Sequence, residues 1–166
     1  MSDNELDLSF DESLNEALRR RIARDLVIRA IAYNDELLRF IALEASAKVL
    51  NKTNLTNIEA EENTELNLFR QDIYIYIKAW LVCSIANDNE MPINFIKHRC
   101  NDKKELYEKA ILYIKEERIK EQDVIDELEY FDRQSKYVED AINLIDEYLT
   151  RLIKLIHNRS FKISKN

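Results

Sequence analysis

Apolar residues recur every three or four positions from about residue 10 to residue 50, which is the spacing of one face of an α-helix. The residues from Ser9 to Glu12 fit a capping box at the start of this helix. Asn34, Asp35 and Glu36 interrupt the stripe with residues that favour helix caps, so the stretch forms either one long helix or two shorter ones. Its apolar positions are Leu14, Leu18, Ile22, Leu26, Ala30, Tyr33, Leu37, Ile41 and Ala45.

The segment from Glu65 to Ala86 permits two interpretations. Its run from Ile73 to Ile77 alternates as a strand would, but the spacing of Phe69, Trp80 and Cys83 around it is helical. No second strand candidate exists, and a lone strand would leave its backbone groups without hydrogen bonds. We therefore expect a helix that is buried on most sides at the centre of a bundle.

The strongest periodicity lies between about residues 122 and 158, where apolar positions alternate steps of four and three. This pattern predicts one long last helix with a coiled-coil-like seam. A helix rises about 1.5 Å per residue, so long first and last helices would extend beyond the middle ones. Unless the first helix breaks near Asn34, the surplus length would pack on another chain. The seam consists of Val124, Leu128, Phe131, Ser135, Val138, Ile142, Ile145, Leu149, Leu152 and Ile156.

The remaining segments complete a helical pattern. Residues 51–64 form a clear loop, and residues 87–92 predict a turn that leads into a short helix to about residue 99. Asn101 and Asp102 would cap a longer helix. Its inner face consists of Tyr107, Ala110, Ile111 and Ile114.

Composition supports this fold class, because the 166 residues include no glycine and one proline. Glycine supplies the positive φ angles of tight turns, so the loops must rely on residues such as Asn and Asp. Nucleotide-binding loops of the P-loop and GxGxxG types and the GxSxG nucleophile elbow all require glycine, and the chain therefore excludes them. The predicted fold is all-α: a single-domain antiparallel helical bundle of four to six helices with long first and last helices.

Charge and hydropathy divide the chain further. We expect a flexible acidic N-terminus at residues 1–8, the helical bundle at 9–158 and a basic tail at 159–166. The most apolar stretch, residues 73–86, is shorter than the roughly 20 residues that a membrane span needs. The acidic start does not resemble a signal peptide, and two cysteines do not form a disulfide framework, so we expect a cytoplasmic protein.

The sequence indicates neither a metal site nor a cofactor site. Neither His98 nor His157 follows a glutamate at the Glu-x-x-His spacing of di-iron bundles. The spacing of Cys83, His98 and Cys100 matches no common zinc pattern, and Cys83 is expected in the core.

Arg151 and His157 lie six positions apart near the end of the last predicted helix. This pair resembles the R-x(4–6)-H signature of the HEPN ribonucleases, in which an arginine and a histidine face each other across a dimer and cleave RNA without a metal. The resemblance implies a metal-independent ribonuclease in which histidine moves a proton and arginine stabilises a phosphorane. The other interpretation is an ion pair between Arg151 and Glu147, with His157 favoured by the helix C-terminus.

Two basic clusters are candidate contacts for nucleic acid or an acidic partner. The net charge of −7 favours the interpretation that their side chains pair with neighbouring acids. The clusters are Arg19, Arg20, Arg21 and Arg24 in the first helix, and Lys97, Arg99, Lys103 and Lys104 near the predicted cap.

Surplus helix length and the heptad seam favour a non-enzymatic helical adaptor or regulatory protein that acts by protein–protein interaction. Its expected partner is another protein or a second copy of the same chain. The alternatives are the ribonuclease that uses Arg151 and His157, and a small helical subunit of a nucleic-acid-binding complex.

Overall fold

The computed structural model describes residues 3–51, 65–86 and 104–158, with the backbone alone at 3–13 and 84–86. All regular structure in these ranges is helical, which confirms the predicted all-α class. No helix within them combines the length and the hydropathy that a bilayer crossing requires. The α-helices are α1 (Asp3–Val27), α2 (Asp35–Val49), α3 (Glu65–Ala86), α5 (Lys104–Glu116), α6 (Gln122–Phe131) and α7 (Val138–Asn158).

The first apolar stripe is divided between two helices, at the place where its capping residues stand. Helix α1 begins at Asp3, ahead of Ser9, and is followed by the π-helical turn η1 (Ile28–Ala32). The side chain of Asn34 then accepts a hydrogen bond from the backbone N–H of Leu37 at 3.1 Å. This bond satisfies a free donor in the first turn of α2, as an N-cap should. Of the two alternatives that the sequence leaves open, the structure therefore shows two helices, with the break near Asn34.

Helices α3 and α5 carry the core contacts that their sequences predict. The α3 residues Ile73, Tyr76 and Trp80 are buried, and the indole N–H of Trp80 donates to the backbone oxygen of Tyr148 at 2.5 Å. The predicted position of Cys83 in the core is confirmed. In α5 the buried residues are Tyr107, Ala110, Ile111 and Ile114, the four that the sequence predicts.

The predicted single helix over residues 122–158 is wrong. Helix α6 ends at Phe131, and the carboxylate of Asp132 accepts a hydrogen bond from the backbone N–H of Tyr137 at 2.7 Å. Such local side-chain bonds compete with helix continuation. The chain also turns at Ser135, where φ is 49°, before α7 begins. The apolar periodicity in the sequence extends across this loop because α6 and α7 each bury one face in the same core.

Left-handed backbone occurs at two residues of the described ranges, Asn51 and Ser135, with φ of 54° and 49°. Asn51 directly follows Leu50, the C-cap of α2, which is a position where glycine is most common and asparagine also occurs. In this glycine-free chain, asparagine and serine therefore take the role that glycine has in most helical proteins.

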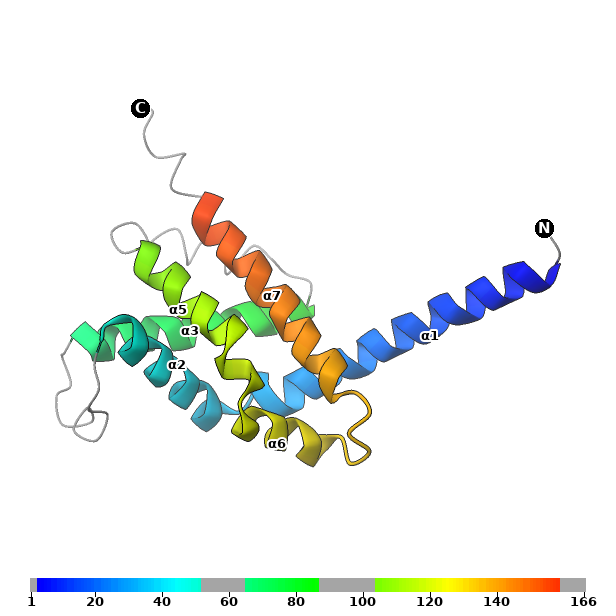
Figure 1. Cartoon of the computed structure of the whole chain (residues 1–166), viewed down its shortest axis with the longest axis horizontal. Helices are drawn as coiled ribbons and strands as arrows, with labels where there is room; N and C mark the ends of the chain where they lie inside the picture. Colours follow the sequence, from blue (N-terminus) through cyan, green and yellow to red (C-terminus); the bar gives the residue numbers. More distant parts are fainter. Residues whose placement is uncertain (1–2, 52–64, 87–103, 159–166) are drawn as a thin grey trace.

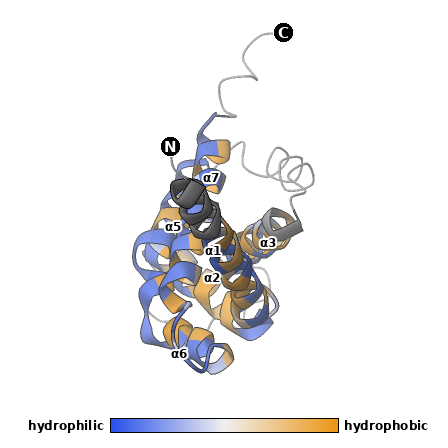
Figure 2. Cartoon of the chain, turned by 90° about the vertical axis from the view of Figure 1, so that its right-hand side faces the viewer, coloured by the Kyte–Doolittle hydropathy of each residue, from blue (hydrophilic) through white to orange (hydrophobic). Residues whose placement is uncertain are grey.

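The helices pack as a body from which α1 projects (Figure 1). The closest packing joins α2 to α3, α5 to α7 and α1 to α7. Figure 2 shows hydrophobic and hydrophilic positions alternating along α5, α6 and α7, as expected of helices with one buried face. The predicted turn at 87–92, the short helix that follows it, the cap at 101–102 and the tail at 159–166 lie outside the described residues.

Candidate interaction surface on α1

Helix α1 has a packed half and a projecting half. Every residue from 14 to 21 is exposed, including Leu14 at 58% and Leu18 at 52%, whereas Ala23 is buried. In Figure 1 the N-terminal part of the helix extends away from all other helices. We name residues 3–21 the projecting segment. The apolar stripe that the sequence predicts is thus uncovered at its first two leucines.

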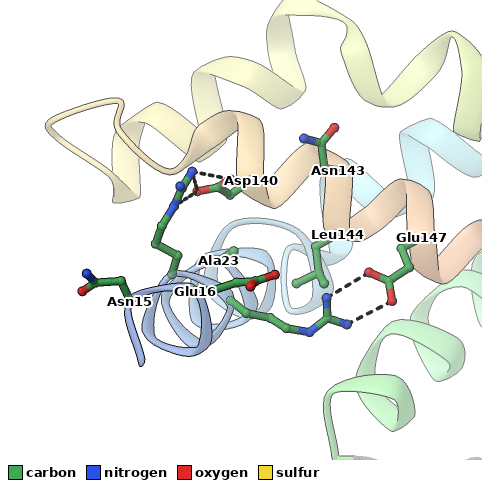
Figure 3. A pocket seen from close by; sticks show the side chains of 9 residues that line it. Asn15, Glu16, Ala23, Asp140, Asn143, Leu144 and Glu147 are labelled. Atoms are coloured by element: carbon green, nitrogen blue, oxygen red, sulfur yellow. Dashed lines mark hydrogen bonds and ion pairs between the residues drawn. The ribbon is translucent and has the colours of Figure 1, made fainter. Parts of the chain in front are cut away.

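Two arginine–carboxylate pairs fix the direction in which α1 leaves the body (Figure 3). Arg19 donates to Asp140 of α7 through Nη2 at 3.0 Å and Nε at 3.2 Å. Arg20 donates to both carboxylate oxygens of Glu147 at 3.0 Å. The hydrogen bond from Arg20 lowers the pKa of Glu147 below its ordinary value. Paired bonds of this kind specify geometry as well as charge.

A groove of about 570 Å³ lies along this junction between α1 and α7. The two ion pairs form its polar part, and Ala23 and Leu144 contribute apolar surface. A second groove, of about 430 Å³, separates α1 from the start of α7 and is lined by Asn15, Leu18, Arg19, Lys136 and Tyr137. The exposed Leu18 therefore stands beside a concave surface that another chain can enter.

The structure describes the whole of the first basic cluster but only Lys104 of the second. Arg19 and Arg20 pair with acids of α7, as the net charge favoured, while Arg21 is exposed and Arg24 is partly buried. Lys104, where α5 begins, donates to the backbone oxygen of His157 at 2.8 Å, in the last turn of α7. In Figure 1 that end of α7 is the one farther from α1. Lys97, Arg99 and Lys103 lie outside the described residues.

Arg151 and His157 contact different neighbours. Arg151 donates to Oε1 of Glu147 on its own helix at 2.5 Å, which confirms the predicted ion pair. His157, in the last turn of α7, places Nδ1 at 3.3 Å from Oε1 of Glu108 on α5. The structure thus turns Arg151 toward the junction with α1 and His157 toward α5.

One charged residue was missed by the sequence reasoning. Arg118, in the 3-10 turn η3 (Arg118–Lys120), is fully buried and donates to Glu44 of α2 and to both oxygens of Asp123 in α6. Burial lowers its pKa, but hydrogen bonds to Asp123 and Glu44 outweigh that effect and raise it. The segment around Arg118 is so rich in charges that nothing in it distinguishes a buried arginine from an exposed one.

The described part of the chain holds no group of three or more His, Cys, Asp or Glu residues that is arranged to bind a metal ion. The uncovered face of α1 and the grooves beside it are therefore the most distinctive surface that the structure offers. No protein family matches this chain, and no curated protein or solved structure is similar to it.

Proposed function

We propose that this protein is a non-enzymatic, cytoplasmic helical adaptor or regulatory protein that binds its partner through the projecting segment of α1. The observation that carries the proposal is the unbroken exposure of residues 14–21, which includes Leu14 and Leu18 one helical turn apart. Helices that lack tertiary contacts are marginally stable in water. A partner that covered these leucines would supply the packing that the other described helices do not.

The anchoring of α1 supports a role in binding. Arg19 and Arg20 hold the base of the projecting segment against α7 through five hydrogen bonds in all. A segment that is fixed in direction loses less conformational freedom when it binds than a free peptide does. Exposed apolar residues at i and i+4 are also the anchors by which helices enter grooves of their partners.

Electrostatics favours a protein partner over nucleic acid. The charges of Arg19 and Arg20 are compensated by Asp140 and Glu147, and the chain carries a net charge of −7. A nucleic-acid backbone would have to displace these carboxylates and approach an acidic protein. Catalysis by Arg151 and His157 has less support, because each side chain is turned toward a different carboxylate.

A comparison of three proteins in native extract tests the proposal. We expect partners to be captured by the wild type and lost from a Leu14→Lys/Leu18→Lys variant. The matched control is Leu68→Lys, because Leu68 on α3 is a leucine of similar exposure, at 56%. The proposal is wrong if the α1 variant retains every partner, or if the control variant loses the same partners.

A further inference from the structure

One face of the projecting segment combines leucine with opposite charges. Positions 11, 14, 18 and 21 follow steps of three and four, so Asp11, Leu14, Leu18 and Arg21 occupy one stripe of the helix. Successive residues turn by about 100°, so this stripe lies roughly half a turn from Ala23, which lines the groove with α7. The stripe therefore lies on the side of α1 opposite the first groove. It is exposed at Leu14 and Leu18, and Leu18 also borders the second groove beside residues 136 and 137.

Charge is segregated along the projecting segment of α1. All six of its acidic residues lie between positions 3 and 16, and arginines follow from position 19. Two such helices in parallel would place acids against acids and arginines against arginines, whereas an antiparallel pair places acids against arginines. The carboxylates belong to Asp3, Glu5, Asp7, Asp11, Glu12 and Glu16, and the arginines are Arg19, Arg20, Arg21 and Arg24.

We infer that the occupant of this face is a second copy of the same chain, whose α1 packs antiparallel against the first. This inference rests on the proposed function, because it names the partner of the same segment. With the two-fold axis between Leu14 and Leu18, Leu14 of one copy faces Leu18 of the other. Asp11 of one copy then lies opposite Arg21 of the other, at each end of the two leucine layers.

These layers agree with the pairing rules of antiparallel helices. Exposed Leu14 and Leu18 form two central apolar layers, and an Asp11–Arg21 layer closes each end of the seam. Because the apolar part is short, we expect an association that depends on protein concentration rather than a permanent dimer.

Sedimentation equilibrium of the purified full chain, over a wide range of concentration, tests the inference. We expect the wild type to form dimers and Leu14→Lys/Leu18→Lys to weaken them by more than about tenfold, which is the scale of losing a central anchor. Leu68→Lys should dimerise as the wild type does. Far-ultraviolet circular dichroism checks that the exposed substitutions leave the helices folded.

Charge reversal tests the antiparallel arrangement. Asp11→Arg and Arg21→Asp should each weaken the dimer, because each places like charges together at both ends of the seam. An equimolar mixture of the two variants should regain dimerisation, since every charged layer is then complementary again. In a parallel pair the single reversals would not weaken association, because like charges already oppose each other in the wild type.

The results separate this inference from the proposed function. A wild type that stays monomeric at every concentration overturns the second copy as occupant, whereas a dimer that the reversals do not weaken overturns the antiparallel arrangement. If such a monomer still loses a protein partner from extract upon Leu14→Lys/Leu18→Lys, the proposed binding function stands with a different partner. If it loses none, both the inference and the proposed function fail.

Discussion

The guanidinium of Arg118 donates to both carboxylate oxygens of Asp123, through Nη1 at 2.7 Å and Nη2 at 2.6 Å, while the side chain is fully buried. Its Nε donates to Glu44, and Phe40 lies with its ring centroid 5.6 Å from the guanidinium carbon. One side chain thus joins α2, η3 and α6. Among the described residues it is the one buried charged side chain.

Replacing Arg118 with methionine should lower the free energy of unfolding by about 3 kcal/mol, because the change leaves Asp123 and Glu44 without their partner. We place the loss at the lower end of the range for buried pairs, since both carboxylates remain partly accessible to water. The check is urea denaturation followed by the fluorescence of Trp80, the single tryptophan. Arg133→Met at an exposed position is the control, and equal stability of the two variants would refute the role of the network.

Stability should decline in acid, because folding lowers the pKa values of several carboxylates, among them Asp123 and Glu147. Hydrogen bonds from Arg118 lower the pKa of Asp123 from 3.8, and those from Arg20 lower the pKa of Glu147 from 4.5. A lowered folded pKa means that the unfolded chain binds the proton first as the pH falls. The stabilisation is therefore complete above the ordinary values and is lost as the pH drops through the folded ones.

We expect urea midpoints of the wild type to fall steadily once the pH goes below 4.5, the ordinary value of Glu147. Asp123→Asn and Glu147→Gln should each reduce this fall, because each removes one linked proton. Glu129→Gln, at an exposed position, should leave the slope close to that of the wild type. Identical slopes in all four proteins would show that neither ion pair is linked to folding.

The helical spans were predictable where the information is local. The periodicity of α3 and α5 and the capping chemistry of Asn34 depend on neighbours a few residues away. The break between α6 and α7 was not, because heptad positions stay apolar on both sides of a loop. Nothing in the sequence around Ser135 signals a left-handed residue.

The sequence predicts which residues form the candidate surface on α1, but it does not predict that this surface is exposed. Periodicity shows that Leu14 and Leu18 share a face of α1, but it cannot show whether another helix covers that face. The pairs of Arg19 with Asp140 and of Arg118 with Glu44 join distant segments of the chain. The packed fold decides which acid forms an ion pair with which arginine. The net charge predicted only that the arginines would pair with acids.

Ser135→Gly should raise the free energy of unfolding by roughly 0.5–1 kcal/mol. A left-handed conformation costs a side-chain-bearing residue about 1–2 kcal/mol, and the extra freedom of glycine in the unfolded chain cancels part of that gain. Gln134→Gly is the matched control, because this neighbour does not have a positive φ and should only lose stability. Urea denaturation measures both, and a loss in both variants would show that Ser135 is not strained.

Single-stranded RNA should remain intact when it is incubated with the purified protein in the presence of a metal chelator. A metal-independent dyad needs arginine and histidine at one phosphate, whereas Arg151 is bound to Glu147 and His157 lies beside Glu108 of α5. The antiparallel α1 pair that we infer also joins the copies through α1, far from the C-terminal end of α7 (Figure 1). Gel electrophoresis of labelled RNA measures the outcome.

The decisive comparison uses Arg151→Ala, His157→Ala and the exposed control Lys154→Ala. If the wild type cleaves RNA and only the first two variants lose that activity, the ribonuclease alternative replaces the adaptor proposal. Equal behaviour of all four proteins is the result that we expect. In that case Arg151 and Arg20 both bind Glu147 in a surface ion-pair network. Replacing either arginine would then change the anchoring of α1 and would not affect RNA cleavage.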